Sequence, residues 1–250
     1  MRVIKVGGRA QGEVALRRAL LAAWRVAPGS FVVVHGGGDE VSALQRALGS
    51  EPTFSGGRRV TTARDLDAVR MVLSGTANKR LVAQLAEARA VGISGEDGGL
   101  MQARVVDPVL GLVGTPCQVN PGILARLLTG GFLPVISPLG RNADDPEGSG
   151  LNVNGDDAAA AIAIALGADE LLLIADVPGV LEAGVPVAAL DPVQVRALIA
   201  DGVAVDGMSA KLQAATLALH GGVGRVRIGD IECIANSSAG TVLSLLPHPA

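Results

Sequence analysis

Short apolar runs rich in β-branched residues alternate along the chain with longer Ala- and Leu-rich stretches typical of helices. The run from Val3 to Val6 precedes a helical stretch from Glu13 to Val26, and the run from Phe31 to Val34 precedes another from Glu40 to Leu48. Because parallel strands are joined by helical crossovers, this alternation predicts an α/β fold in which helices cover both faces of a mostly parallel sheet.

The same alternation continues to the end of the chain, with one interruption. Further strands are predicted at 90–94, 133–137, 170–175 and 225–228, and further helices at 63–73, 78–88, 122–128, 158–166, 193–200 and 209–219. Between Leu100 and Val119 the pattern alternates and contains Gly and Pro, which predicts an antiparallel β-hairpin inserted in the α/β frame. The polar stretch from Gly140 to Gly150 is expected to be a mobile surface loop.

Composition and charge exclude several classes of protein. Of 250 residues, 49% are apolar, which is enough for a large core and excludes intrinsic disorder. The net charge of −3 offers no broad basic surface, so nucleic acid is not an expected partner. The longest apolar run, from Ala158 to Leu166, is about half of the ~20 residues that a membrane-spanning helix needs. The N-terminus lacks the pattern of a signal peptide, so we expect a cytoplasmic protein.

Cysteine and histidine do not form a metal-binding pattern. Cys117 and Cys233 belong to no C-x-x-C pair, and the histidines at 35, 220 and 248 match no zinc spacing, so no dedicated protein metal site is predicted. One Trp, three Phe and no Tyr are few for a recognition module, whereas the 34 glycines suggest backbone placed close to a ligand.

Three segments share a layout in which a strand runs into small or polar residues and then into a helix. They are Lys5-Val6-Gly7-Gly8, His35-Gly36-Gly37-Gly38 and Asn152-Val153-Asn154-Gly155-Asp156-Asp157. In a parallel sheet such turns meet at one edge, where helix N-termini present N–H groups to anions, so we expect a phosphate or carboxylate site. Each turn alone is equally consistent with an ordinary turn or helix cap. Neither the P-loop nor the dinucleotide fingerprint is present.

Lysine is rare in this chain, which draws attention to where it occurs. Lys5 lies on the first predicted strand beside a glycine turn, and Lys211 lies near the start of a predicted helix. A buried ammonium group needs an anionic partner, which makes Lys5 a candidate for ligand binding. Taken alone, Lys5 is as consistent with a strand end that reaches solvent, and Lys211 and the Arg58–Arg59 pair are as consistent with surface charges.

Seven ordered motifs together resemble the amino acid kinase family, and within it the N-acetyl-L-glutamate kinases, over essentially the whole chain. They are K-V-G-G at 5–8, H-G-G-G at 35–38, G-R-R-V-T at 57–61, G-T-A-N-K at 75–79, N-V-N-G-D at 152–156, D-V-P-G-V at 176–180 and D-G-M-x-x-K at 206–211. The resemblance implies a three-layer αβα sandwich on a mainly parallel eight-stranded sheet. It also implies an N-terminal lobe, 1–167, for the amino-acid substrate and dimerisation, and a C-terminal lobe, 168–250, for ATP.

The implied reaction moves the γ-phosphoryl group of ATP onto the side-chain carboxylate of N-acetyl-L-glutamate, a step of arginine biosynthesis. By resemblance, Lys5 and Lys211 stabilise the phosphoryl group, Asp156 holds both ammonium groups, and the N–H groups of Gly8 and Gly37 bind phosphoryl oxygens. Mg²⁺ is expected on the β- and γ-phosphates. A carboxylate is already ionised at neutral pH, so no general base and no catalytic histidine are expected.

The resemblance also implies binding residues for both substrates. On the acceptor side Gly37 and Gly38 lie against the substrate, Arg59 binds its α-carboxylate, and Asn152 binds its α-carboxylate and amide. The nucleotide is expected against Asp176, Val177, Pro178, Gly179, Val180, Val203, Ala204 and Val205. Two positions depart from the family pattern, because Thr62 stands where Asp is common and Asp206 where Gly is common. The missing N-terminal helix of arginine-inhibited hexamers favours a homodimer without arginine feedback.

Two alternatives of different kinds stay open. One is a kinase for N-blocked α-aminoadipate in lysine biosynthesis, against which the full H-G-G-G and R-V-T motifs weigh. The other is a catalytically silent amino-acid or nucleotide sensor on the same fold. The presence of Lys5, Asp156 and Lys211 together argues against a sensor, because binding alone does not require two ammonium groups directed at a phosphoryl group.

Overall fold

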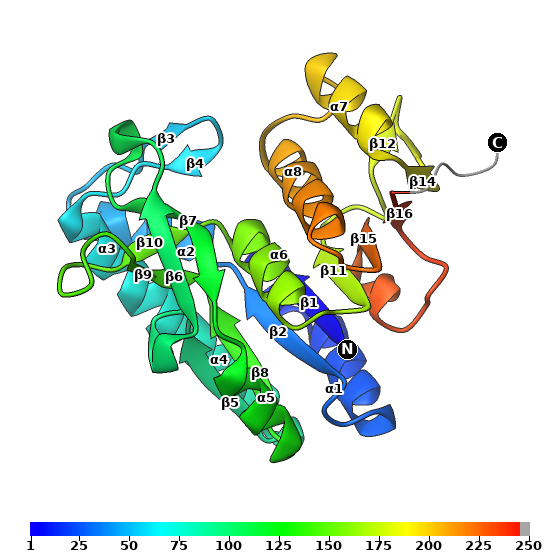
Figure 1. The fold of residues 1–250 in the computed structure, drawn as a ribbon, viewed down its shortest axis with the longest axis horizontal. Coiled ribbons are helices and arrows are strands. Elements are labelled where there is room, and N and C mark those ends of the chain that lie inside the picture. Colours follow the sequence, from blue (N-terminus) through cyan, green and yellow to red (C-terminus); the bar gives the residue numbers. More distant parts are fainter. Residues whose placement is uncertain (246–250) are drawn as a thin grey trace.

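The chain folds around one eight-stranded sheet with the strand order β14-β16-β15-β11-β1-β2-β8-β5 (Figure 1). The computed structural model describes residues 1–245, so the end of the predicted C-terminal lobe, including His248, lies outside the described residues. The strands are β1 (Arg2–Val6), β2 (Phe31–His35), β5 (Ala90–Ser94), β8 (Leu133–Ser137), β11 (Glu170–Ile174), β14 (Ala189–Leu190), β15 (Arg225–Gly229) and β16 (Thr241–Leu243). Neighbouring strands are parallel except for β15 and β16, which confirms the predicted mainly parallel sheet.

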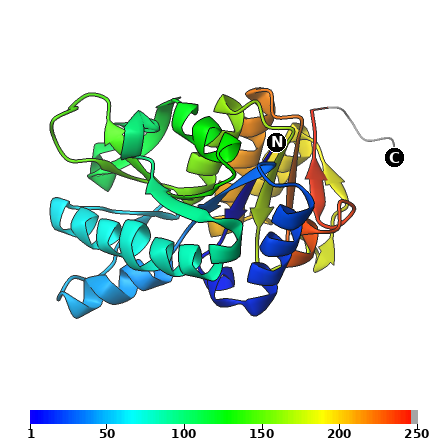
Figure 2. The ribbon, with the colours of Figure 1, turned by 90° about the horizontal axis from the view of Figure 1, so that it is seen from below.

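Helices cover both faces of this sheet, which confirms the three-layer sandwich. Figure 2 shows the blue and cyan helices α1 to α4 on one side of the sheet and the green and orange helices α5, α6 and α8 on the other. The helices are α1 (Val14–Val26), α2 (Gly38–Ala47), α3 (Ala63–Arg70), α4 (Asn78–Gln84), α5 (Gly122–Thr129), α6 (Gly155–Ala165), α7 (Pro192–Ala200) and α8 (Asp206–His220).

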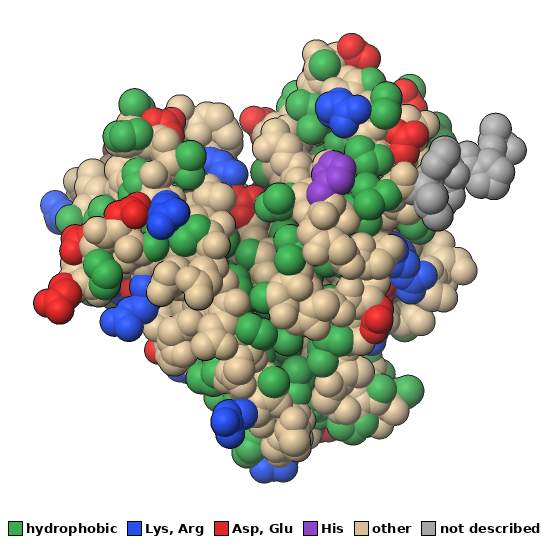
Figure 3. Space-filling model, viewed as in Figure 1, with side chains coloured by type: hydrophobic (Ala, Val, Ile, Leu, Met, Phe, Trp, Pro, Cys, Tyr) green, Lys and Arg blue, Asp and Glu red, His purple; other side chains and the backbone are tan. Residues whose placement is uncertain are grey.

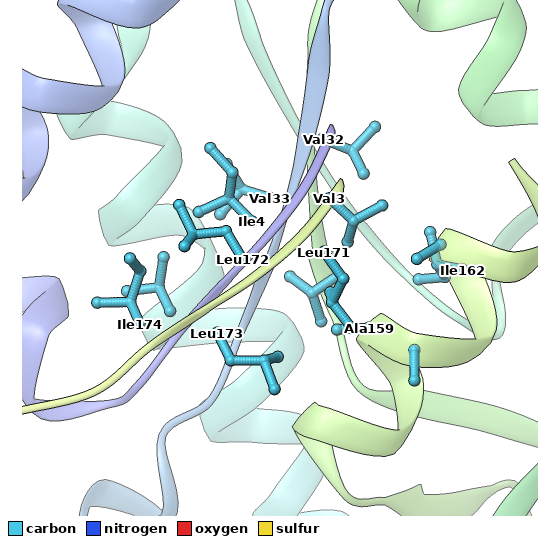
Figure 4. Packing of buried hydrophobic residues seen from close by; sticks show 14 of the residues in the cluster. Val3, Ile4, Val32, Val33, Ala159, Ile162, Leu171, Leu172, Leu173 and Ile174 are labelled. Atoms are coloured by element: carbon cyan, nitrogen blue, oxygen red, sulfur yellow. The ribbon is translucent and has the colours of Figure 1, made fainter. Parts of the chain in front are cut away.

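The central strands are continuous apolar runs because both of their faces are buried. Every residue of β2 and β11 is buried, which is the pattern expected for parallel strands between two helical layers. Figure 4 shows how the side chains alternate: Val3, Val32, Leu171 and Leu173 lie on the side of Ala159 and Ile162 of α6, and Ile4, Val33, Leu172 and Ile174 lie on the opposite side.

The predicted inserted hairpin is confirmed as β6 (Met101–Val105) and β7 (Val113–Val119), which pair antiparallel. These strands join β9 (Leu139–Asn142) and β10 (Leu151–Val153) in a small closed barrel. The prediction of a loop from Gly140 onward is therefore wrong for its first three residues, which belong to β9. Packing is tight at Gly140, since a Cβ there would lie 3.2 Å from the Cβ of Ala103.

The predicted helices 63–73 and 78–88 form one uninterrupted helical segment with a wide turn in its middle. A π-helical stretch, η2 (Met71–Ala77), connects α3 directly to α4, and the predicted second helix ends at Gln84 before a separate 3₁₀ turn, η3 (Ala86–Ala88). π-Helical turns occur frequently beside functional sites. This one faces the second glycine turn, as described below.

The remaining elements are short. They are the hairpins β3 (Phe54–Ser55) with β4 (Arg58–Arg59) and β12 (Leu181–Glu182) with β13 (Val185–Pro186), and the 3₁₀ turns η1 (Arg9–Gly12), η4 (Asp97–Gly99), η5 (Pro108–Leu110) and η6 (Ile231–Ile234). The predicted lobe boundary at 167/168 falls between α6 and β11, and β11 pairs directly with β1. Among the described residues no helix is both long and apolar enough to cross a membrane.

Candidate active site

The first two glycine turns touch each other at the carboxyl edge of the sheet. β1 and β2 end side by side, with Val6 paired to His35, and a Cβ on Gly8 would lie 3.1 Å from the Cα of Gly37. Gly37 has a φ of +157°, and a Cβ there would lie 2.8 Å from Cδ2 of Leu73 in η2. Only glycine fits at Gly37 without a shift of its neighbours. The two turns thus bring backbone N–H groups of separate strands close together.

The third turn aligns a buried carboxylate with this edge. Asn154 caps α6, since its Oδ1 accepts from the N–H groups of Asp156 at 2.8 Å and Asp157 at 3.4 Å. The helix therefore begins three residues earlier than predicted, and Asp156 lies buried in its first turn. A Cβ on Gly155 would lie 3.2 Å from Cε of Lys5, so the missing side chain leaves room for the lysine.

Lys5 and Lys211 meet at the carboxylate of Asp156. Nζ of Lys5 lies 2.9 Å from Oδ1 of Asp156, and Nζ of Lys211 lies 3.2 Å from Oδ1 and 3.1 Å from Oδ2. Burial would raise the pKa of Asp156, but the two ammonium groups outweigh it and hold that pKa below its ordinary value. Burial, together with the nearby charge of Lys5, lowers the pKa of Lys211 to about 8.

A cavity of about 550 Å³ opens above these groups. It is lined by Lys5, Gly7, Gly8, Arg9, Gly38, Asp39, Gly57, Ile174, Ala175, Asp176, Val177, Gly207, Met208 and Lys211. Figure 3 shows a hollow between the surface over β3 and β4 and the surface over α7 and α8, with charged side chains along it. Two ammonium groups and the first two glycine turns line one cavity, and together they form a donor set suited to a polyphosphate.

Arg59 is buried next to the second glycine turn, where protein atoms accept several of the hydrogen bonds of its guanidinium group. It lies 4.8 Å from the ring centre of Phe54 and donates to the carbonyl oxygen of Gly38 and the hydroxyl of Ser42, each at 2.8 Å, and to Oε1 of Gln45. Both hydrogens of Nη2 are used in this way. The N–H of Nε and one N–H of Nη1 remain as donors for a carboxylate. A bidentate pair of hydrogen bonds is not available, because each such pair includes a hydrogen of Nη2.

A chain of hydrogen bonds fixes Arg59 from behind. Gln45 donates to Oδ1 of Asp65 at 2.7 Å, and Asp65 forms a capping box with Thr62 at the start of α3. Burial would raise the pKa of Asp65, but hydrogen bonds, first from Thr62 and then from Gln45, lower it. Thr62, which departs from the family pattern, therefore has a clear structural role as a helix cap.

Asn152 lies on β10 and is linked to Arg59 through Thr61. Its Nδ2 donates to Oγ1 of Thr61 at 3.1 Å, and that hydroxyl donates to the carbonyl oxygen of Arg59 at 3.3 Å. The second departure from the family pattern, Asp206, has a φ of +46°, a conformation that glycine adopts more readily. The family preference for Gly at this position thus matches the backbone found here.

The residues predicted for nucleotide binding divide into two groups. Asp176 and Val177 line the cavity, whereas Pro178, Gly179, Val180, Val203, Ala204 and Val205 are absent from its lining within residues 1–245. The side chains of Val180 and Ala204 are buried in the core, and the N–H of Val180 donates to Oγ1 of Thr241 at 2.8 Å. For Val180 this contact anchors the turn to β16.

The structure adds charged groups that the sequence left unassigned. Arg9 enters the cavity lining beside Asp39, and Arg58 pairs with Asp157 at 2.8 Å, joining β4 to α6. Burial raises the pKa of Asp157, and Arg58 offsets only part of this effect. The paired carboxylates at 156 and 157 were a signal for a second ion pair, but only the tertiary structure supplies its partner.

His35 is buried and hydrogen-bonded rather than directed at the cavity. Burial lowers its pKa to about 4, so it is neutral at physiological pH. Its Nδ1 donates to the carbonyl oxygen of Gly36 at 2.8 Å, and its Nε2 accepts from Nδ2 of Asn78 at 3.1 Å. Within residues 1–245 no group of three or more His, Cys, Asp or Glu side chains is arranged to hold a metal ion.

Comparisons with known proteins agree on one family. Residues 1–230 match the model of the amino acid kinase family. The chain is 46% identical over 237 residues to the acetylglutamate kinase of Paracoccus denitrificans, an overlap that covers 91% of this chain and 76% of that protein. It is 42% identical over 254 residues to the acetylglutamate kinase of Roseiflexus sp. (strain RS-1), covering 98% and 95%.

Solved structures share the fold. The crystal structure of smu.665 from Streptococcus mutans UA159 superposes with a TM-score of 0.88 at 29% identity, covering 98% of each chain. Carbamate kinase from Giardia lamblia bound to AMP-PNP superposes with a TM-score of 0.73, covering 97% of each chain. At 17% identity, the second likeness concerns the fold alone.

Proposed function

Because the chain belongs to the amino acid kinase family, we propose that it transfers the γ-phosphoryl group of ATP to the side-chain carboxylate of N-acetyl-L-glutamate. The products are N-acetyl-L-glutamyl 5-phosphate and ADP, and the reaction is a step of arginine biosynthesis. Its relatives at 46% and 42% identity carry the name acetylglutamate kinase. The observation that carries the proposal is the pair of ammonium groups on Asp156 beneath a cavity edged by glycine turns.

The chemistry explains why this arrangement suits the reaction. Donor and acceptor are both anionic, so their repulsion dominates the barrier, and catalysis depends on positioning and on fixed positive charge. Lys5 and Lys211 supply that charge, while Asp156 keeps both protonated groups aimed at one place. The N–H groups of Gly8 and Gly37 add fixed donors for phosphoryl oxygens. No general base is required, because the attacking carboxylate is already ionised.

The acceptor is proposed to lie on the side of the cavity formed by residues 1–167. Gly37 and Gly38 contact it, Arg59 binds its α-carboxylate through Nε or the remaining Nη1 hydrogen, and Asn152 binds the carboxylate and amide. Arg59 therefore binds the substrate through a single hydrogen bond, or it gives up its hydrogen bond to Gly38 or Ser42 and donates to the substrate in its place.

ATP is proposed to bind on the side formed by residues 168–250. Asp176 and Val177 line the cavity, and we keep the other predicted residues, 178–180 and 203–205, as part of the proposed nucleotide site although they lie outside its lining. The lysines and glycine turns fit its polyphosphate chain. Mg²⁺ would neutralise charge on the β- and γ-phosphates, which are its proposed ligands. We also propose a cytoplasmic homodimer, for which sedimentation analysis tests the assembly.

One assay separates this function from the two alternatives. The protein is incubated with MgATP and hydroxylamine, which traps an acyl phosphate as a hydroxamate, and acetylglutamate is compared with acetylaminoadipate. Steady hydroxamate production with acetylglutamate supports the proposal. Faster production with acetylaminoadipate supports the lysine-pathway kinase, and nucleotide binding without turnover supports a sensor. The names of the relatives favour neither alternative.

A further inference from the structure

Arg9 joins two carboxylates that line the cavity and come from segments far apart in the sequence. It follows Gly8 directly and begins η1. Its Nε lies 3.3 Å from Oδ2 of Asp39, in the first turn of α2, and its Nη1 lies 3.2 Å from Oδ2 of Asp176, in the turn after β11. All three residues line the cavity that contains Lys5 and Lys211.

The residues that line and underlie this cavity form two charged groups of opposite net charge. Lys5 and Lys211 together with Asp156 carry one net positive charge, while Arg9 with Asp39 and Asp176 carries one net negative charge. Two carboxylates at the entrance would repel an anionic nucleotide if nothing opposed them. Arg9 is the cation placed to oppose them.

The ion pairs of Arg9 are exposed to solvent, so Arg9 can exchange a carboxylate partner for another anion. Its side chain is 75% exposed, and those of Asp39 and Asp176 are 78% and 52% exposed. Exposed ion pairs contribute little to stability, so exchanging one carboxylate for another anion costs little. The guanidinium group matches phosphate oxygens with two parallel donors, which makes phosphate a strong competitor for it.

Resting on the proposed function for the identity of the nucleotide, we propose that Arg9 is a third phosphate-binding cation of the site. In the free protein Asp39 and Asp176 hold it at the entrance. When the nucleotide binds, Arg9 leaves Asp39, the more exposed of its two partners, and pairs with oxygens of the terminal phosphates. Asp39 is then a competitor for Arg9, and its removal favours binding.

The test measures nucleotide binding by calorimetry, without the acceptor, using the β,γ-imido analogue of ATP with Mg²⁺. Arg9→Gln is expected to weaken binding about tenfold, in line with one lost charge-assisted contact. Arg18→Gln, which removes the same charge from the exposed face of α1, is the matched control and is expected to bind as the wild type does. Asp39→Asn is expected to bind the analogue more tightly. AMP, which lacks the terminal phosphates, is expected to bind the wild type and Arg9→Gln alike.

A double-variant cycle separates a phosphate contact from simple shielding. If Arg9 contacts phosphate, Arg9→Gln weakens binding in the Asp39→Asn background at least as much as in the wild type. If Arg9 only screens Asp39, its effect shrinks in that background, and the inference is overturned. Equal binding by wild type and Arg9→Gln also overturns it while leaving the proposed function intact. A wild type that binds no nucleotide overturns both.

Discussion

Lys211 donates to both carboxylate oxygens of Asp156, at 3.2 Å and 3.1 Å, in a pocket where its pKa is lowered to about 8. Nζ of Lys5 lies 2.9 Å from Oδ1 of the same carboxylate, so one buried negative charge is paired with two positive charges. This cluster of three side chains therefore retains one uncompensated positive charge, which an incoming phosphoryl group neutralises.

The activity should fall at alkaline pH because Lys211 loses its proton there. We expect kcat/KM for ATP to decline above about pH 8, since this parameter reports the free protein. In the substrate complex the phosphates favour the charged form, so the decline in kcat should lie at higher pH. Lys211→Arg, whose side chain does not titrate in this range, should show no such decline. If kcat/KM of this variant declines at the same pH, the decline is due to another titrating group.

Asp156→Asn should abolish most of the activity and leave nucleotide binding measurable. The amide removes the anion that lies between two buried ammonium groups, which then repel each other and move apart. We expect kcat to fall by on the order of 10² or more, as for loss of a group that acts in the transition state. Steady-state kinetics and calorimetry with ADP check this together. A near-normal rate would leave Asp156 only a role in the first turn of α6.

Arg59→Ala should act mainly on acceptor binding. We expect KM for acetylglutamate to rise at least tenfold with kcat changed much less, because the proposed contact forms equally in the ground and transition states. Gln45→Leu removes the group that holds Arg59 from behind and should give a smaller rise in the same parameter. A change confined to kcat in both variants would place Arg59 at the phosphoryl group instead.

Gly8→Ala should disturb the contact between the first two glycine turns. Its Cβ would lie 3.1 Å from the Cα of Gly37, which is a backbone atom and cannot turn away as a side chain can. We expect a loss of about 1–3 kcal/mol in unfolding free energy, as for overpacking, together with reduced activity. Gly12→Ala, at the end of the 3₁₀ turn that follows Gly8, meets nothing within 4 Å and is the control. Equal denaturation midpoints for the two variants would contradict the proposed contact.

Acidification should destabilise the fold through His35. Its pKa is about 4 in the folded protein and about 6.5 in the unfolded chain, so between these values the unfolded chain binds more protons. The unfolding free energy should therefore fall as pH drops from about 6.5, by about 3 kcal/mol once His35 is titrated below pH 4. Urea unfolding at several pH values measures this. His35→Gln should lose that part of the pH dependence, and parallel curves would contradict it.

The elements that could be predicted from the sequence are those whose pattern lies within one short segment of the chain. Strands such as Phe31–His35 are buried on both faces and appear as unbroken apolar runs, and the glycine turns follow them directly. The motifs placed Lys5, Asp156 and Lys211 in one reaction, and the structure brings these three side chains together.

Features that depend on distant partners escaped the sequence. The stretch that contains β9 is polar and rich in turn residues, so it was predicted as a loop, and the close packing of Gly140 on Ala103 is a tertiary contact that local propensity does not express. The π-helical turn likewise places Leu73 against Gly37, far away in sequence. The ion pairs of Arg9 with Asp39 and Asp176 join residues up to 167 positions apart, so no local pattern could assign them.

The pairing of β1 with β11 has a mechanical consequence. The two strands are in register from Arg2 with Glu170 to Lys5 with Leu173, so no flexible tether separates the parts of the molecule that carry Lys5 and Asp176. Any change of angle between these parts is a change in the twist of a continuous sheet, an elastic deformation shared among several strands rather than a rotation at one joint. The spacing of Lys5 from its strand partner Leu173, three residues before Asp176, is therefore as stiff as the sheet itself.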